Sequence, residues 1–455
     1  DRYPYGCTEQ TVSRAMPLVY LDRTILAAGL AGAGSEDIDK RSRDAIEAVL
    51  ANQASNGAFG LWRPDGGDLW LDAYVTDFLT RAREAGYAVP DTAFRLAIDA
   101  LRNGLAYLPS EPDYAPVAYA SYVLARNGRA AIGDLRYLAD TQLGRLPTPL
   151  AKAQVAAALA LYGDRIRAER VFRAAVAEAE TPRRDPSRTD FGTALRDDAA
   201  VLTLALETGV DGVALDRLVS QVDAGRDART RTSTQEDAWS LLAAHALLTE
   251  APPRLEIDGT VREGAYAGRF GGAALEAGVP AIVNRAVDAV TAEVTVRGVP
   301  RVAPPAVSDG YQITRSYRAL TGEPVDPSVV GQGDRLVAVL EIMPLDEGFA
   351  RVMVDDPLPA GFEIDNPALL RGGDVAALDI ALDGDAEHVE FRAERFLAAF
   401  DKGQGDTAPR RFAYVVRAVS PGEFVHPAAS VEDMYRPERR GRTNETRVSV
   451  VGPLR

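Results

Sequence analysis

The chain has a single cysteine, Cys7, among its 455 residues, so it cannot form an internal disulfide. The absence of disulfides suits a cytosolic protein and a cysteine-poor periplasmic one equally, and assigns neither compartment. A lone cysteine most often behaves as a small buried hydrophobic residue. Any chemical role for Cys7 must therefore be argued from the residues around it.

Histidine is almost as scarce, since the chain has only His245, His388 and His426. A cysteine protease would need a general base beside the Cys7 thiol. His245 and His426 are the candidates for that base, but neither lies in a motif that supports the role. A cysteine-protease activity therefore has no support beyond the presence of these residue types.

Long apolar runs and excess basic charge are also missing. No run reaches the roughly 18 apolar residues that a membrane-spanning helix needs. The net charge is −15, from 66 acidic and 51 basic residues, whereas nucleic-acid binding requires a basic face. We therefore expect no nucleic-acid partner.

The length suggests about two to four domains. The chain starts at Asp1 without a signal peptide, so we expect a fragment of a longer protein or a processed product.

The residues around Cys7 form one stretch, Tyr3-Pro4-Tyr5-Gly6-Cys7-Thr8-Glu9-Gln10. Side chains three residues apart in a helical turn face the same way, so Gln10 can lie beside Cys7. A thiolate that attacked the Gln10 side-chain amide would expel ammonia and leave an internal thioester. Such a bond is a stored acyl donor, with a sulfur leaving group and an electrophilic carbonyl.

A helix is expected to begin here, with Thr8 as its N-cap and apolar positions through Val12 and Tyr20. Pro17 would lie in its interior and predicts a kink or a late start. Backbone N–H groups at a helix start favour a thiolate and an oxyanion. This placement would help a thioester both to form and to open.

Alanine- and leucine-rich amphipathic segments follow, and several of them end at a glycine, the residue expected just past a helix end. These glycines are Gly86, Gly128, Gly163 and Gly209. They lie roughly 35 to 46 residues apart, which is the period of a helical-hairpin repeat. Repeated hairpins close into a toroid or run as an open solenoid, and the period does not decide between them.

Three carboxylates, Asp68, Asp72 and Asp77, support a different hypothesis. Toroids of helical hairpins also occur in carbohydrate-active enzymes, which use paired carboxylates as acid and base. Asp68 and Asp72 would share a face if the segment were helical throughout. We favour a solvated helix surface for these residues and keep the enzyme, with Asp72 and Asp77 as acid and base, as the alternative.

The residue pattern changes near Ala251-Pro252-Pro253, where short alternating runs replace helical periodicity. Ile257-Asp258-Gly259-Thr260 predicts a hairpin turn, and Ala292–Arg297 alternates as a strand. Val302–Val307 contains two prolines and predicts a linker. From Gly310 onward we expect a separate β-sandwich. Its predicted strands are Tyr311–Tyr317, Leu336–Ile342, His388–Arg392, Arg411–Val416, Glu423–His426 and Arg447–Val451.

The opening stretch, extended to Thr11, resembles the thioester motif of the alpha-2-macroglobulin and complement family, and of its bacterial members above all. Further stretches are similar to later parts of the family: Gly57–Trp62, Leu69–Asp77, Ser233–Trp239, Gly331–Asp334 and Asp356–Glu363. The resemblance implies a multidomain α plus β fold. Residues 1–250 would form an α/α toroid thioester domain, 251–307 the returning part of a CUB-type β-domain, and 308–455 a macroglobulin-like β-sandwich.

The function that the resemblance implies is that of a broad-spectrum protease inhibitor and not an enzyme. Cys7 and Gln10 would form the thioester, supported by Gly6 and Glu9. The bond stays shielded until a protease cuts a bait region, and it then acylates an amine on that protease. No cofactor, metal or catalytic residue is expected. The full-length protein would be a lipoprotein of the periplasm, held at the inner membrane by an N-terminal lipid, with a role in bacterial defence.

The resemblance also implies a lock over the thioester, made by Tyr3 together with Met434 and Tyr435. Considered alone, the Met434-Tyr435 pair is more typical of core packing at a sheet end. Some complement relatives use a histidine about a hundred residues beyond the thioester to favour hydroxyls. None lies between Gln10 and His245, which predicts a preference for amines. A module that uses the reactive bond to attach to surfaces is a further alternative.

Overall fold

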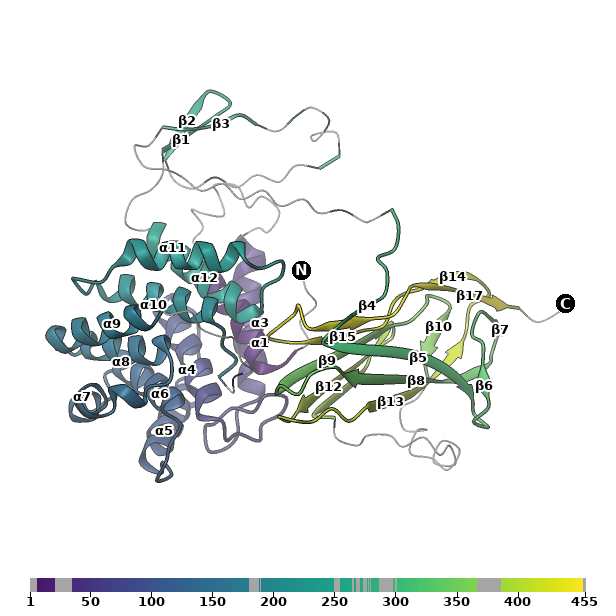
Figure 1. The fold of residues 1–455 in the computed structure, drawn as a ribbon, viewed down its shortest axis with the longest axis horizontal. Coiled ribbons are helices and arrows are strands. Elements are labelled where there is room, and N and C mark those ends of the chain that lie inside the picture. Colours follow the sequence, from purple (N-terminus) through teal and green to yellow (C-terminus); the bar gives the residue numbers. More distant parts are fainter. Residues whose placement is uncertain are drawn as a thin grey trace. The chain divides into compact units, whose positions relative to one another are not determined.

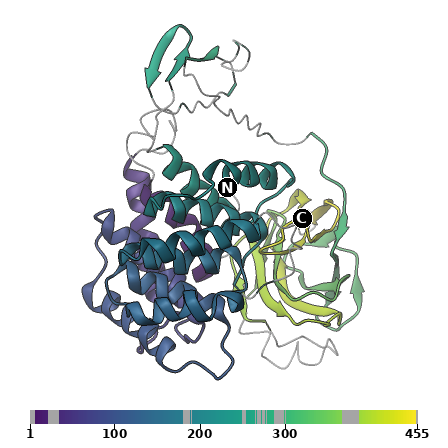
Figure 2. The same ribbon diagram turned by 60° about the vertical axis from the view of Figure 1, so that its left-hand side comes forward.

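The computed structural model describes residues 6–20, 35–179, 190–248, 254–263, 280–285, 301–365 and 386–452, with a few single positions between them. Contacts divide the chain into two compact units. The first comprises Asp1–Arg229 and Thr234–Val294, and the second comprises Thr230–Ser233 and Thr295–Arg455. Described helices belong to the first unit, and most described strands to the second (Figures 1 and 2). The predicted division into three domains stays a prediction.

Helices make up most of the first unit. They are α1 (Thr8–Ala15), the 3-10 helix η1 (Met16–Tyr20), α3 (Ser35–Ala51), α4 (Leu69–Glu84), α5 (Asp91–Ala106), α6 (Tyr114–Arg126), α7 (Ile132–Thr141), the 3-10 helix η2 (Leu143–Arg145), α8 (Pro149–Leu161), α9 (Arg165–Ala179), α10 (Ala194–Thr208), α11 (Leu215–Asp227) and α12 (Thr234–Leu248). Among the described helices, none is both long enough and apolar enough to cross a membrane.

Helices α4, α6, α8 and α10 are buried on nearly all sides. They pack in succession, α4 on α6, α6 on α8 and α8 on α10, and α10 packs on α12. Helix α1 contacts both α12 and α4, so this series of contacts returns to the helix that carries Cys7. Helices α5, α7, α9 and α11 bury one face each and pack against members of the series, which is typical of amphipathic surface helices.

The predicted glycine stops are confirmed. Gly86, Gly128, Gly163 and Gly209 have φ angles of +90°, +65°, +79° and +54°, and they follow α4, α6, α8 and α10. A side chain is strained in this left-handed region, and glycine is not. The repeat visible in the sequence therefore marks the ends of four extensively buried helices.

Three short strands form an antiparallel sheet in the order β2-β1-β3: β1 (Arg254–Ile257), β2 (Thr260–Glu263) and β3 (Ile282–Asn284). The predicted hairpin turn is confirmed, because Asp258 and Gly259 join β1 to β2 with positive φ angles of 46° and 81°. Two positive φ angles match the twist of a tight hairpin. The strand predicted at residues 292–297 lies outside the described residues.

The second unit is built from strands. They are β4 (Val307–Asp309), β5 (Tyr311–Ala319), β6 (Pro324–Val325), β7 (Val329–Gly331), β8 (Arg335–Pro344), β9 (Ala350–Pro357), β10 (Phe362–Ile364), β11 (His388–Phe391), β12 (Arg395–Lys402), β13 (Arg410–Ala418), β14 (Gly422–His426), β15 (Ser430–Asp433), β16 (Arg440–Arg442) and β17 (Thr446–Val451). All six predicted strands are confirmed. The predicted linker ends one residue early, since Val307 begins β4.

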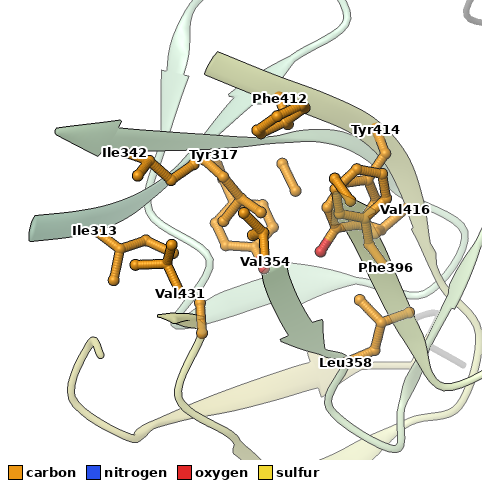
Figure 3. Packing of buried hydrophobic residues seen from close by; sticks show 14 of the residues in the cluster. Ile313, Tyr317, Ile342, Val354, Leu358, Phe396, Phe412, Tyr414, Val416 and Val431 are labelled. Carbon is orange, nitrogen blue, oxygen red and sulfur yellow. The ribbon is translucent and has the colours of Figure 1, made fainter. Parts of the chain in front are cut away.

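These strands form a five-stranded sheet (β10-β13-β8-β5-β6), a six-stranded sheet (β11-β12-β9-β15-β16-β4) and a three-stranded sheet (β14-β17-β7). One hydrophobic core joins the two larger sheets (Figure 3). Ile342 and Tyr414 come from the five-stranded sheet, and Val354 and Phe396 from the six-stranded one. The rings of Phe396 and Tyr414 stack with centroids 4.5 Å apart. The two larger sheets, antiparallel throughout, thus form a sandwich around their own core, while β7 pairs in parallel with β17.

Candidate functional site

The start of α1 places Cys7 and Gln10 in one helical turn. Cys7 itself is the N-cap, with φ −68° and ψ 152°, and its Sγ accepts the Gln10 backbone N–H at 3.4 Å. Gly6, before it, has a φ of +87°. The prediction of Thr8 as the N-cap was wrong by one residue. From Met16 the chain continues as η1, so Pro17 lies in a 3-10 helix.

A loop before α4 explains why Thr8 does not cap the helix. The Thr8 hydroxyl donates to the Gly60 carbonyl at 2.6 Å and accepts from the Asn52 amide at 2.8 Å. Its backbone N–H donates to the Leu61 carbonyl at 2.8 Å. A Cβ on Gly60 would lie 1.7 Å from the Arg63 carbonyl oxygen, so the loop requires glycine there. These bonds hold the residue next to Cys7 from one side.

A buried polar cluster holds the helix from the other side. The Glu9 carboxylate accepts from the Ser13 hydroxyl at 2.5 Å and from the Gln235 amide at 2.6 Å. The Gln235 amide also donates to the Ser13 oxygen, which lies 2.9 Å from the Tyr74 hydroxyl. Burial, and then the charge of Glu9, raise the pKa of Tyr74, so its phenol stays neutral. The cluster joins α1, α4 and α12.

The Gln10 side chain is 4% exposed. Its Oε1 is buried, and no residue in the described part of the chain donates a hydrogen bond to it. Leaving a buried amide oxygen without a donor costs roughly 1–3 kcal/mol. The arrangement therefore combines a sulfur nucleophile with an amide carbonyl that nothing described stabilises.

The predicted solvated surface is wrong for Asp72 and Asp77, since both are buried in α4. Asp72 accepts the Phe59 N–H at 2.6 Å. Burial raises the pKa of Asp72 to about 7, against the effect of the Phe59 N–H, and the nearby charge of Asp68 adds to the rise. Asp68 is only partly buried and caps α4 by accepting the Trp70 and Leu71 N–H groups.

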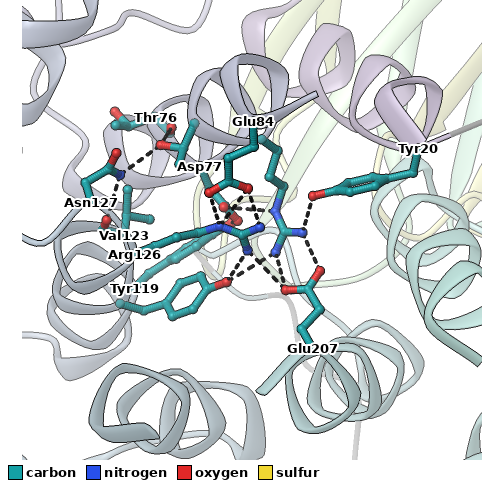
Figure 4. Close-up of polar contacts among 12 residues, drawn as sticks. Tyr20, Thr76, Asp77, Glu84, Tyr119, Val123, Arg126, Asn127 and Glu207 are labelled. Atoms are coloured by element: carbon teal, nitrogen blue, oxygen red, sulfur yellow. Dashed lines mark hydrogen bonds and ion pairs between the residues drawn. The ribbon is translucent and has the colours of Figure 1, made fainter. Parts of the chain in front are cut away.

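Asp77 belongs to an ionic network and is not a solvated acid (Figure 4). Its carboxylate accepts the Arg81 Nε–H at 2.9 Å and the Tyr119 hydroxyl at 3.0 Å. A general acid or base must reach its substrate, which a carboxylate enclosed by such partners does not. The alternative of an acid–base pair made by Asp72 and Asp77 thus has no geometric support. Within the described residues, no cluster of metal-ligating side chains occurs either.

Arg81 is the centre of this network and its side chain is 0% exposed. Besides Asp77, its N–H groups reach Glu207 at 2.6 and 3.2 Å, the Tyr20 hydroxyl at 2.8 Å and the Tyr122 hydroxyl at 3.2 Å. All five guanidinium N–H groups are thus used. Burial disfavours the Glu207 carboxylate, but the charges of Arg81 and Arg126 outweigh it and lower the pKa of Glu207. The network connects η1, α4, α6 and α10.

Comparison with known proteins places these features in a family. Residues 310–438 match the family model described as Bacterial Alpha-2-macroglobulin MG10 domain. The alpha-2-macroglobulin of Xylella fastidiosa strain Temecula1 is 33% identical over 99% of this chain and 29% of that protein. The alpha-2-macroglobulin of Escherichia coli strain K12 is 30% identical over 96% of this chain and 28% of that protein. The chain belongs to the bacterial alpha-2-macroglobulins.

Solved structures of bacterial alpha-2-macroglobulins agree with this assignment. Native E. coli alpha-2-macroglobulin from domain MG7 to the C-terminus has a TM-score of 0.80 and 27% identity, over 99% of this chain and 74% of that one. Salmonella alpha-2-macroglobulin reacted with methylamine has a TM-score of 0.83 and 28% identity, over 99% of this chain and 30% of that one. The chain spans less than a third of the curated relatives that it matches over nearly its whole length.

The residues predicted to lock the thioester belong to the second unit and to the start of the chain. Met434 and Tyr435 follow β15 on a turn that Asp433 organises. The Asp433 carboxylate accepts the Tyr435 N–H at 3.0 Å and the Arg436 side chain at 2.7 Å, while the Met434 N–H donates to the Arg351 carbonyl. The turn therefore holds the pair in a defined conformation. Tyr3 lies outside the described residues.

His245 and His426, the two histidines considered as possible bases, each contact a tyrosine in this alpha-2-macroglobulin chain. His245 in α12 lies against the Tyr20 ring, with centroids 5.1 Å apart. His426 is buried in the sandwich, with its Nε2 3.0 Å from the Tyr317 hydroxyl. Burial, and then the charge of Arg315, lower the pKa of His426 to about 3, so the ring is neutral at physiological pH. Each ring thus has a described structural contact.

Sequence reasoning missed Ser13 and Tyr74, and it gave Gln235 no role. Ser13 lies four residues after Glu9 on α1, a spacing that predicts contact within a helix. Gln235 belongs to the stretch singled out by resemblance, but its 226-residue separation from Glu9 gives no local signal. These residues surround the thioester motif and do not belong to it.

Proposed function

We propose that this chain carries the acyl donor of a bacterial protease inhibitor, an internal thioester between Cys7 and Gln10. The Cys7 sulfur attacks the Gln10 side-chain carbonyl carbon. A sulfur–carbon bond forms, the carbon–nitrogen bond breaks, and ammonia leaves with the thiol proton. The observation that carries the proposal is the Cys7 Sγ at the start of α1, 3.4 Å from the Gln10 backbone nitrogen, with both side chains buried.

The surroundings of the Gln10 carbonyl support the same reaction. An amide oxygen is a strong acceptor, so its burial without a donor from any described residue is costly. A thioester oxygen is a weaker acceptor and loses less in the same place. Without a donor from the described residues, the carbonyl also lacks oxyanion stabilisation, which slows attack on it both when the thioester forms and when water would hydrolyse it.

The acyl transfer that we propose uses an amine of the captured protease. The amine forms an amide with the Gln10 acyl group, and the sulfur leaves as the Cys7 thiol. A thiolate is a good leaving group, so no general base from this chain is required. Reaction with methylamine, named for the Salmonella relative, supports an amine nucleophile. We propose broad specificity, because any accessible lysine would serve.

The finer architecture and the location are part of the proposal. The returning series of contacts through α1, α4, α6, α8, α10 and α12 supports a closed α/α toroid. We assign residues 1–250 to it, 251–307 to the returning CUB-type part and 308–455 to the macroglobulin-like sandwich. We further propose a periplasmic protein held at the inner membrane by an N-terminal lipid, on the basis of the family resemblance alone.

Tyr3, Met434 and Tyr435 are proposed to shield the thioester from water and amines. Replacing Tyr435 or Met434 with alanine should then speed loss of the thioester in buffer, because the smaller side chain excludes less water from the bond. The loss is measured as thiol release over time. Exposed Tyr107, which is 85% exposed, gives the matched control Tyr107→Ala. Equal rates in all variants would remove the lock from the proposal.

Mass spectrometry and methylamine test the thioester directly. The intact chain should be lighter than its sequence mass by one ammonia. Methylamine should add to Gln10 and release one titratable thiol per chain. A chain of full mass, with its thiol titratable directly after refolding in amine-free buffer, would contradict the proposal. A mass that corresponds to hydrolysed Gln10 would instead show that the bond formed and then reacted with water.

A further inference from the structure

We propose that Gln235 of α12 is a positioning residue for thioester formation. With Ser13 and Tyr74 it fixes the Glu9 carboxylate, and so holds the first turn of α1 in the conformation that places Cys7 beside Gln10. The inference rests on the proposed function and adds a residue to it. Gln235 lies outside the thioester motif and 226 residues from Glu9.

The hydrogen inventory of the cluster is complete around Ser13. A serine hydroxyl has one proton to donate and two lone pairs to accept with. The Ser13 proton goes to Glu9, and its lone pairs accept from Tyr74 and from Gln235. Since the Tyr74 phenol is neutral, its proton is available for this bond. The direction of each bond in the cluster is therefore determined.

Gln235 completes the cluster from α12. Its amide nitrogen has two protons, and one reaches Glu9 at 2.6 Å while the other reaches Ser13 at 3.1 Å. Both acceptors are on α1, one helical turn apart, so a single side chain forms hydrogen bonds with the helix at two points. Glu9 and Gln235 are each 0% exposed, and a buried carboxylate depends strongly on its donors.

These two bonds matter because α1 is short, with Cys7 as its N-cap and Gln10 in its first turn. It has only the eight residues Thr8–Ala15. The loop contacts of Thr8 and the cluster around Glu9 hold the two residues that separate Cys7 from Gln10. Bond formation needs reacting atoms about 3–3.5 Å apart, and a misplacement of about 1 Å costs on the order of 10²-fold in rate. Fraying or distortion of the first turn of α1 is therefore expected to slow thioester formation.

Gln235→Glu is the most informative variant, because it keeps the shape and replaces the donor with a carboxylate. Two carboxylates at hydrogen-bond distance do not both stay ionised without strong repulsion. We expect the rate of ammonia loss after refolding of the full chain to fall about 10- to 100-fold. Gln235→Met removes the donor without adding charge and should cause a smaller fall in the same direction.

Combining Glu9→Gln with Gln235→Glu restores the pair with its roles exchanged. The amide donor then comes from position 9 and the carboxylate from position 235, so the rate should recover toward that of the original chain. The single and double variants are compared under conditions where their melting temperatures match. If Gln235 had a purely structural role, the rate of ammonia loss would then not recover in the double variant. The control Gln142→Glu makes the same change at another buried glutamine, which contacts Tyr137. It should leave the rate unchanged.

Alkylation of Cys7 by iodoacetamide separates this inference from the proposed function. If the original chain forms a thioester and Gln235→Glu forms it equally fast, the positioning role is overturned and the proposed function stands. If the original chain forms none, the proposed function falls, and with it any role of Gln235 in thioester formation; alkylation of Cys7 that is at least about tenfold faster in Gln235→Glu would then show only that Gln235 stabilises the start of α1. Unchanged alkylation together with no thioester would overturn both.

Discussion

Replacing Arg81 with methionine should destabilise the helical unit by about 3–5 kcal/mol, the usual effect of breaking a buried ion pair. Methionine fills similar volume but leaves Asp77 without its cationic partner and removes a cation from Glu207. Arg81 and Asp77 are both 0% exposed, so water has little access to the Asp77 carboxylate and cannot substitute for the lost guanidinium. Denaturant unfolding of the whole chain, followed by the helical circular dichroism signal, measures the change.

Arg83 provides the matched control, because it lies on the same helix and also pairs with an aspartate. The Arg83–Asp91 pair is 2.9 Å long, but its side chains are 38% and 88% exposed. Such pairs contribute about 0–1 kcal/mol, so Arg83→Met should have little effect. Arg81→Lys keeps the charge but loses the planar fork, and should fall between the two. Equal shifts for Arg81→Met and Arg83→Met would show that the network does not stabilise the unit.

The elements that could be predicted from the sequence are those with a local cause. Gly86, Gly128, Gly163 and Gly209 end the buried helices because their positive φ angles strain other residues. The Asp258-Gly259 turn follows the same reasoning. Strands β9 and β12 were missed, although they lie side by side in the six-stranded sheet. Their burial depends on the facing sheet, which the local pattern does not contain.

The candidate site likewise has residues that the sequence predicts and residues that it does not. Cys7 and Gln10 are recognisable because their chemistry depends on a three-residue spacing, which one helical turn provides. The contacts of Ser13 with Tyr74 and of Glu9 with Gln235 depend on how α1, α4 and α12 pack, so no local pattern predicts them. Asp72 and Asp77 were assigned to solvent because carboxylates are mostly exposed. Their burial becomes intelligible only with the groups that donate hydrogen bonds to them, the Phe59 N–H and Arg81.

Replacing Cys7 with alanine should abolish reaction with amines while leaving the fold intact. Alanine is tolerated at the start of a helix at a cost of about 0.5–2 kcal/mol when a cap is lost. Without the sulfur, the Gln10 amide keeps its nitrogen, which is a very poor leaving group at neutral pH. The intact chain should then have its full sequence mass, and methylamine should add nothing. Adducts that persist in Cys7→Ala would identify a different acyl donor.

The unsubstituted chain should in turn prefer methylamine to glycerol by roughly 10²–10⁴-fold, the contribution that a positioned general base makes to such reactions. A hydroxyl needs that base to become a competent nucleophile, whereas a neutral amine does not. No histidine lies between Gln10 and His245, and the His245 ring lies against Tyr20. Mass spectrometry of the adducts at equal nucleophile concentrations gives the ratio, and His245→Gln should leave it unchanged. Comparable ester and amide yields, with esters lost in His245→Gln, would instead make His245 the base that directs the thioester to hydroxyls.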